Sequence, residues 1–277
     1  MIDLSLHIQI YGQLIMYMKN HWKAFKHAIL EGRILSLPSL RVKEDLDREI
    51  WDEKDQLKSD IREKLLEIAN DFWKNQDLEH VEIKDIIFTG SLANYNWSKF
   101  SDVDLHIVID YTDVNEDAEL VRKYFNSIKS VWNRDHDIWV KDYEVEMYVQ
   151  DYLEPHVATG IYSVKKGEWL KKPSKFNPEI DYKCVTIKAN CIMDEIDEIQ
   201  RDFDEEQYEK VHEKAIFLKE KIRNMRKSGL ETGGAFSVEN LAFKVLRRSV
   251  YLKKLNDLKL MSYDNLQSIK ENSEPEV

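Results

Sequence analysis

Apolar residues recur at steps of three and four in several stretches of the chain, which is the pattern of an amphipathic helix. These stretches are residues 5–30, about 42–75 and about 116–132. The pattern returns at 180–227, where it predicts one long helix or a pair of helices, and in VENLAFKVLRRSVYLKKL, which begins at residue 238. Helices are therefore expected at both ends of the chain and once in its middle.

Three shorter stretches have the pattern of a β-strand instead. DIIFT (85–89) is apolar almost throughout, whereas DVDLHIVID (102–110) and YEVEMYVQD (143–151) alternate polar with apolar residues. A period of two gives each of these strands one polar and one apolar face. The segment 155–178 holds three of the five prolines and is expected to be a connector with one short strand.

This order of elements predicts an α+β fold in which a small mixed sheet is flanked by helices. The loop KSGLETGGAFS (227–237) is expected to end at Ser237, whose side chain would cap the following helix. The predicted divisions are N-terminal helices that pack on the core (1–80), the core (81–178), a C-terminal helical region (179–270) and a frayed tail (271–277).

Composition fits a soluble globular protein, since 43% of the 277 residues are hydrophobic and 34% are charged. Cys184 and Cys191 lie seven residues apart in a predicted helix, which is too far for a disulfide. Their reduced state favours a cytoplasmic location. The apolar stretch IQIYGQLIMYM is too short for a membrane span and lacks the flanks of a signal peptide, so no membrane partner is expected.

The net charge of −11 disfavours unspecific binding of nucleic acid over the whole surface. The charge is uneven, however, because residues 194–209 carry −8 and residues 210–260 carry +8. One interpretation is a solvated helix with two differently charged ends. The other is that the basic segment faces phosphates held elsewhere in the protein.

Acidic residues occupy the polar face of both alternating strands. Asp102 and Asp104 point to the same side, about 6–7 Å apart, where they repel each other unless water or a cation intervenes. Glu144 and Glu146 repeat the pattern on the later strand. If the two strands are neighbours, their carboxylates could hold two Mg²⁺ ions about 3.5–4 Å apart. Either pair alone is more often simply a solvated strand face.

Gly90 and Ser91 follow the first strand directly. A strand that ends at Gly and enters a helix at Ser leaves backbone N–H groups, and the positive end of a helix dipole, to bind phosphate oxygens. Gly90 would permit close approach of the backbone, and the Ser91 hydroxyl would add a donor. Ser101 could bond the adjacent Asp102 carboxylate or only end the loop. A Gly-Ser pair by itself usually marks a turn.

The order FTGS (88–91), a gap, then SDVDL (101–105) resembles the signature of the nucleotidyltransferase superfamily with the polymerase-beta-like core. The sequence around this motif is similar to that of nucleotidyltransferases predicted in tailed phages. It consists of GSLANYNWSKFSDVDLHIVID, EVEMYVQDYLEPH, GIYSVKKGEWL and SVENLAFKVLRRSVYLKKL. The resemblance spans roughly residues 42–265, with the motif itself confined to 87–151. It implies that the small mixed sheet is a nucleotidyltransferase core.

The resemblance also implies roles for individual residues. Gly90 and Ser91, with Ser101 beside them, would bind the triphosphate. Asp102, Asp104 and Glu146 would be the catalytic acids and would bind two Mg²⁺ or Mn²⁺ ions. Glu146 is the first choice for the third acid, and Glu144 is the second choice. That third acid would also take the proton of the attacking hydroxyl. Relatives that modify antibiotics often carry Arg soon after Gly-Ser, whereas this chain reads Leu-Ala-Asn-Tyr there, so their substrates do not carry over.

The superfamily often appends a helical region whose basic residues meet the triphosphate. Lys244 and Arg248, four residues apart on one helix face, are the candidates here. Solvation of a basic surface is the alternative. Between the Gly-Ser pair and the acids, Tyr95 and Trp97 could stack on a base or hold the loop on the core, and His106 could meet a phosphate or simply be packed.

These features predict a metal-dependent nucleotidyltransferase that moves a nucleoside monophosphate from a triphosphate to a hydroxyl group and releases pyrophosphate. The acceptor could be an RNA end such as that of tRNA, a protein or a small molecule. The enzyme would work in the cytoplasm, that of the host cell if the chain is phage-encoded. The alternative is a catalytically silent nucleotide-binding or phage-associated structural protein with the same fold.

Overall fold

The computed structural model describes residues 37–156, 158–175 and 178–268. The predicted helix at 5–30 and the tail at 271–277 lie outside these ranges. The described chain is α+β, as predicted, and divides at Pro38 and Pro178 into two compact units. We call them the sheet unit (38–177) and the helical unit (from Pro178 onward), and each is described by itself.

The sheet unit holds a mixed sheet of six strands within its described residues, in the order β3-β4-β2-β1-β5-β6. The strands are β1 (Asp85–Thr89), β2 (Val103–Ile109), β3 (Trp139–Val140), β4 (Tyr143–Asp151), β5 (Ile161–Ser163) and β6 (Glu168–Lys171). Only β2 and β4 are parallel to each other. The three predicted strands are confirmed, and the connector supplies the hairpin β5-β6 where a single strand is predicted.

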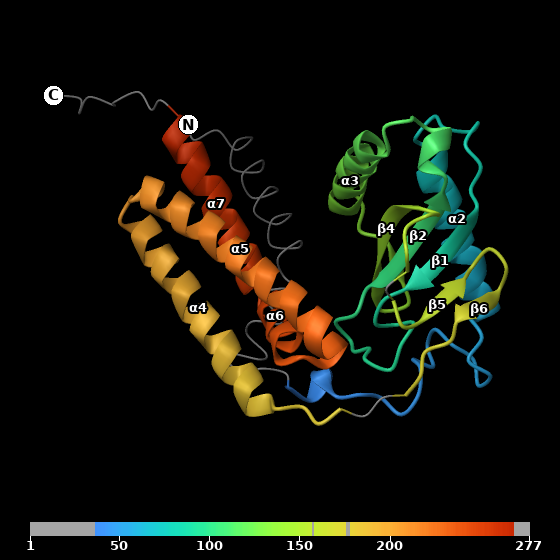
Figure 1. Cartoon of the computed structure of the whole chain (residues 1–277), viewed down its shortest axis with the longest axis horizontal. Helices are drawn as coiled ribbons and strands as arrows, with labels where there is room; N and C mark the ends of the chain where they lie inside the picture. Colours follow the sequence, from blue (N-terminus) through green and yellow to red (C-terminus); the bar gives the residue numbers. More distant parts are fainter. Residues whose placement is uncertain (1–36, 157, 176–177, 269–277) are drawn as a thin grey trace, which may run out of the picture. The chain divides into compact units, whose positions relative to one another are not determined.

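One face of the sheet is apolar and is covered by the helices α2 (Ser59–Lys74) and α3 (Ala118–Asp135). Figure 1 shows α2 behind the strands and α3 beside β4. Leu105 of β2 and Met147 of β4 are fully buried there. The intervening residues of both strands turn to the opposite face, since strand side chains alternate. The acids of β2 and β4 therefore lie on the face of the sheet that is opposite α2 and α3.

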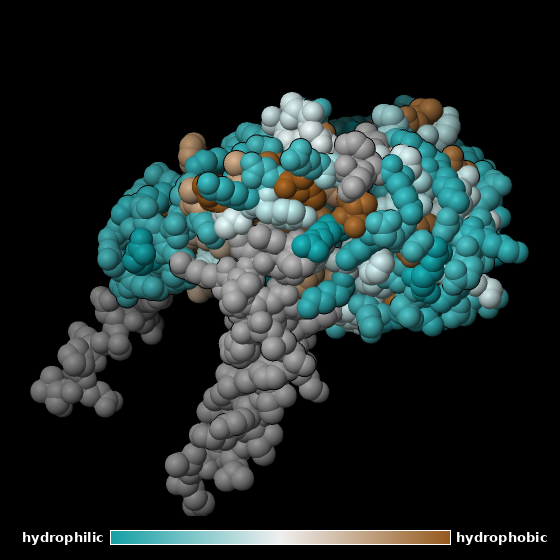
Figure 2. Space-filling view, turned by 90° about the horizontal axis from the view of Figure 1, so that it is seen from below, coloured by the Kyte–Doolittle hydropathy of each residue, from teal (hydrophilic) through white to brown (hydrophobic). Residues whose placement is uncertain are grey.

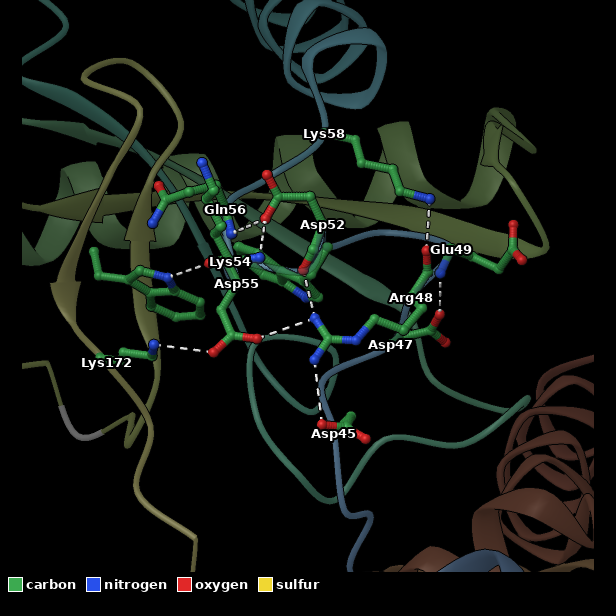
Figure 3. A network of polar contacts seen from close by, with 12 residues as sticks. Asp45, Asp47, Arg48, Glu49, Asp52, Lys54, Asp55, Gln56, Lys58 and Lys172 are labelled. Carbon is green, nitrogen blue, oxygen red and sulfur yellow. Dashed lines mark hydrogen bonds and ion pairs between the residues drawn. The ribbon is translucent and has the colours of Figure 1, made fainter.

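The predicted helix at 42–75 is wrong in its first half, because α2 begins only at Ser59. The Asp52 carboxylate accepts hydrogen bonds, each 2.8 Å long, from two backbone N–H groups that follow it. Arg48 reaches across this turn to Asp55 at 3.0 Å (Figure 3). Aspartate side chains that accept hydrogen bonds from nearby backbone amides favour turns over helix. The spacing of apolar residues contains no information on these hydrogen bonds, so it predicts a helix here.

The helical unit contains four α-helices among its described residues. They are α4 (Tyr182–Asp204), α5 (Tyr208–Gly233), α6 (Val238–Arg248) and α7 (Tyr251–Gln267). The helix-pair interpretation of 180–227 is confirmed. The loop predicted to begin at residue 227 is wrong at its start, since α5 continues to Gly233, but Ser237 does cap α6 by accepting a hydrogen bond from the Asn240 N–H at 3.3 Å.

The last predicted helix is two helices, because the single residue Val250 adopts a left-handed backbone conformation and interrupts it. That residue has φ of 65°, in the left-handed region, and separates α6 from α7. The backbone of a β-branched residue reaches this region only at a cost in free energy, so the break is imposed by packing and carries no local signal such as Gly or Pro. Apolar spacing alone therefore joins the two helices into one.

The acidic and basic segments of the helical unit pair with each other. The Asp202 carboxylate accepts hydrogen bonds from Lys210 at 2.7 Å and from Lys214 at 2.8 Å, and these bonds lower its pKa. The Lys254 ammonium lies 2.8 Å from Asp197, so α7 contributes as well. Neither interpretation of the charge pattern anticipated this arrangement, in which part of the basic segment neutralises part of the acidic segment.

Cys184 and Cys191 are both free thiols on exposed positions of α4, which confirms that they form no disulfide. Among the residues that the structure describes, no helix combines the length and the apolar character needed to cross a membrane. The face of the molecule in Figure 2 is mostly hydrophilic, with apolar side chains in small groups.

Candidate active site

The pairing of β2 with β4 sets acids side by side on the polar face of the sheet. Asp104 lies directly beside Glu146 in the parallel register. The same register, continued by one residue, places Asp102 beside Glu144. Neighbouring strands are about 4.8 Å apart, whereas residues two apart along one strand are about 6–7 Å apart, so each acid is closest to its partner across the strands. The structure therefore sets Asp104 beside Glu146 and continues the acidic face with Asp102 and Glu144.

Gly90 directly follows β1 and lies against one of these acids. Its φ is +80°, and a Cβ atom at this position would lie 1.8 Å from Oδ2 of Asp104. The preceding residue, Thr89, pairs with Asp104 across the strands. Any side chain at residue 90 would displace the Asp104 carboxylate, so glycine is required for its close approach to the backbone. The Gly-Ser pair and the acid pair are thus parts of one site.

The helix predicted to start at Ser91 is absent, because residues 91–96 form successive turns. Within them the Asn94 N–H donates to the Ser91 carbonyl at 3.2 Å. A helix dipole therefore contributes nothing to phosphate binding here, and any such binding must come from local backbone N–H groups and the serine hydroxyl. A short polar segment after Gly can satisfy its hydrogen bonds in turns, which is why the sequence does not distinguish the two cases.

Ser101 is buried and holds the two ends of this loop together. Its hydroxyl oxygen accepts a hydrogen bond from the Ser91 hydroxyl at 2.7 Å and another from the Ser98 N–H at 2.9 Å. Ser101 thereby fixes Ser91 next to the start of β2. Its direct contact with phosphate stays a prediction, whereas its contact with Ser91 is structural.

The rest of the loop is fastened to the core by groups that the sequence analysis did not single out. The Trp51 indole N–H donates to the Leu92 carbonyl at 2.8 Å, and the Lys43 N–H donates to the Tyr95 carbonyl at 2.7 Å. Tyr95 itself is buried and packs in the core. Of the two interpretations for this aromatic ring, packing is the one that the structure supports.

A packed aromatic group borders the acids on the same face. The Tyr148 hydroxyl donates to the Glu146 carboxylate, and its ring stacks on His106 with centroids 4.6 Å apart. Burial lowers the pKa of His106 to about 4, so this imidazole is neutral at pH 7. Burial, and then Asp104 and Glu146, raise the pKa of Tyr148, so its hydroxyl remains a donor.

Lys129 of α3 completes this group, with Nζ 3.9 Å from the centre of the Tyr148 ring. Sequence reasoning missed both residues. The strand period could have predicted Tyr148, because it lies two positions after Glu146 and must share its strand face. No sequence pattern predicts Lys129, since only the packing of α3 on β4 brings it to the site.

Lys244 and Arg248 lie on α6, in the helical unit, where both are half-buried. The candidate site is therefore built here from the sheet unit alone. The contact of these two residues with a triphosphate stays a prediction.

The donor set suits a hard divalent cation, because every candidate ligand is a carboxylate oxygen. Searching only the described part of the chain, we find no group of three His, Cys, Asp or Glu side chains already arranged around one ion position. The Asp104–Glu146 pair with Gly90 against it nevertheless fits Mg²⁺ in ligand chemistry. Assembly of such a centre requires the carboxylates to turn toward a common point.

Comparison of the chain with protein-family models, with curated proteins and with solved structures gives no match.

Proposed function

We propose that the chain is a metal-dependent nucleotidyltransferase whose sheet unit is a polymerase-beta-like catalytic core. The observation that carries the proposal is the position of Asp104, which lies beside Glu146 on one side and against Gly90 on the other. A carboxylate pair that could hold metal ions, next to a glycine that directly follows a strand, is the arrangement that the resemblance implies for nucleotidyl transfer from a triphosphate. The resemblance of FTGS and SDVDL to the superfamily signature supports the same function.

In this proposal each residue has a defined role. Asp102, Asp104 and Glu146 would hold two Mg²⁺ ions, which neutralise phosphate charge and lower the pKa of the acceptor hydroxyl. The backbone at Gly90 would bind oxygens of the triphosphate, and the Ser91 hydroxyl would join it by turning its O–H from Ser101 to a phosphate oxygen. Glu146 accepts the proton of the acceptor hydroxyl.

The reaction is an in-line substitution at the alpha phosphorus of the triphosphate. The acceptor oxygen forms a bond to that phosphorus while the bond to the bridging oxygen breaks, and pyrophosphate leaves with that electron pair. Positioning and electrostatic stabilisation provide most of the catalysis in reactions of this kind.

The charge of the sheet unit limits the acceptor. Residues 38–177 contain thirty acidic and twenty basic side chains. A long nucleic acid would be repelled by this surface, because its binding depends on neutralisation of phosphates by Lys and Arg. The acceptors that remain are a short exposed RNA end, a protein side chain or a small molecule with a hydroxyl group.

Label transfer tests this function. The purified chain is incubated with each triphosphate, labelled at the alpha phosphate, with Mg²⁺ or Mn²⁺ and a cell extract. We expect label to move to RNA, protein or a small molecule, and the double variant Asp102→Ala, Asp104→Ala to abolish the transfer. Binding of a labelled triphosphate without any transfer would instead favour the catalytically silent alternative.

A further inference from the structure

We propose that Lys129 is the internal counter-ion of the Asp104–Glu146 pair, and that a divalent cation bound by these acids takes over its role and displaces the Tyr148 hydroxyl from Glu146. This inference rests on the proposed function, because it concerns the same acids. It adds that, without metal, a basic side chain from α3 compensates part of the charge of the two acids. Lys129 and Tyr148 are positioning residues in this proposal and do not bind the ion.

The position of Lys129 is fixed by an unusual contact between α3 and β4. Four residues further along α3, the Asn133 side chain donates to the Met147 carbonyl at 3.1 Å and accepts from the Met147 N–H at 2.9 Å. The Asn133 side chain thus makes the two hydrogen bonds with the Met147 backbone that a neighbouring strand would otherwise make. Since residues four apart lie on the same helix face, the Asn133 contact sets Lys129 at the edge of the sheet beside Tyr148.

Tyr148 connects the ammonium group to the acids. Lys129 lies over one face of its ring and His106 stacks on the ring at 4.6 Å, so the phenol is held from two directions. Its hydroxyl is bonded to the Glu146 carboxylate. A phenol fixed in this way holds Glu146 in one orientation, in which an oxygen lone pair is used by Tyr148 and unavailable to a cation.

The charge of Lys129 acts on the same two acids. The ammonium lies over the ring whose hydroxyl is bonded to Glu146, which places its charge near that acid. Burial lowers the pKa of Lys129, and Glu146 and Asp104 oppose that shift. Adjacent carboxylates on parallel strands repel each other, and a nearby cation relieves the repulsion. A bound divalent cation would serve the same purpose with twice the charge. Lys129 and the metal ion therefore compete for the two carboxylates.

Metal affinity measured without catalysis tests this competition. Binding of Mn²⁺ to the full chain is followed by loss of the electron paramagnetic resonance signal of the free ion, for the wild type and for Lys129→Met, Lys129→Arg, Tyr148→Phe and Asp104→Asn. We expect Lys129→Met to bind Mn²⁺ about tenfold more tightly, because one positive charge near the site is removed. Lys129→Arg keeps the charge and should bind like the wild type, and Tyr148→Phe should bind a few times more tightly.

Urea unfolding of the metal-free proteins provides the second measurement. Lys129→Met should lower the midpoint in the wild-type background and have a smaller effect in the Asp104→Asn, Glu146→Gln background, where no charge is left to neutralise. Equal effects in both backgrounds, or an unchanged Mn²⁺ affinity of Lys129→Met, would overturn the inference. If the wild type and Asp104→Asn both fail to bind Mn²⁺ while the unfolding midpoints remain coupled, the proposed function fails and the counter-ion role stands.

Discussion

Replacing Asp102 and Asp104 together by Asn is expected to reduce nucleotidyl transfer by about a thousandfold or more, which corresponds to a loss of about 4 kcal/mol of transition-state stabilisation. The isosteric change removes charge and keeps the volume. Relief of the repulsion between carboxylates offsets the counter-charge that Lys129 loses, so the stability of the variant should stay within about 1 kcal/mol of that of the wild type. Initial rates of label transfer and urea unfolding measure the two effects.

Asp110→Asn is the matched control for this variant. Asp110 follows the other end of β2, where its carboxylate accepts hydrogen bonds from the Thr112 N–H at 2.9 Å and from the Thr112 hydroxyl. Asparagine can accept the same bonds, so transfer should be unchanged. Equal losses in the control and in the double variant would mean that charge on β2 acts at long range, and the acids would have no special role.

Gly90→Ala should lose transfer by about a hundredfold with only a modest loss of stability. The new Cβ would meet the Asp104 carboxylate at 1.8 Å, so the Asp104 side chain must rotate away from the site. Misplacement of a catalytic group by about an ångström costs about a hundredfold in rate. The left-handed backbone adds roughly 1 kcal/mol to the free-energy cost of folding, as for any alanine at positive φ.

Gly234→Ala separates these two contributions. Gly234 has φ of +67°, and a Cβ there would meet no atom within 4 Å. This control also places alanine at a positive φ, at a cost in stability, but without a collision, and its transfer rate should equal that of the wild type. A Gly90→Ala protein that transfers label at the wild-type rate would show that Asp104 need not lie where the structure places it.

The strands could be predicted from the sequence because burial on one face imposes a period of two. Asp104, Glu144 and Glu146 follow from that period, and so would Tyr148 if it were applied two residues further. That β2 and β4 are parallel neighbours could not be read from it, since strand pairing is a contact between distant segments. The position of Lys129 likewise depends on how Asn133 fastens α3 to β4.

The failures have local or tertiary causes that apolar spacing ignores. The Asp52 carboxylate bonds backbone amides and keeps the chain before Ser59 out of a helix. Val250 breaks the last helix through a conformation that its residue type does not favour. In the helical unit, Lys210 and Lys214 are bound to Asp202, so charge that the sequence leaves available for phosphate is partly used within the unit.

A crystal structure with Mn²⁺ and a triphosphate analogue that has a methylene group between its alpha and beta phosphorus atoms tests the central claim most directly. Anomalous scattering should locate two ions bound by Asp102 and Asp104, with Glu146 on one of them and the phosphates against residues 90–91. Ions bound elsewhere, or a triphosphate held away from this end of β1, would contradict the assignment of the site.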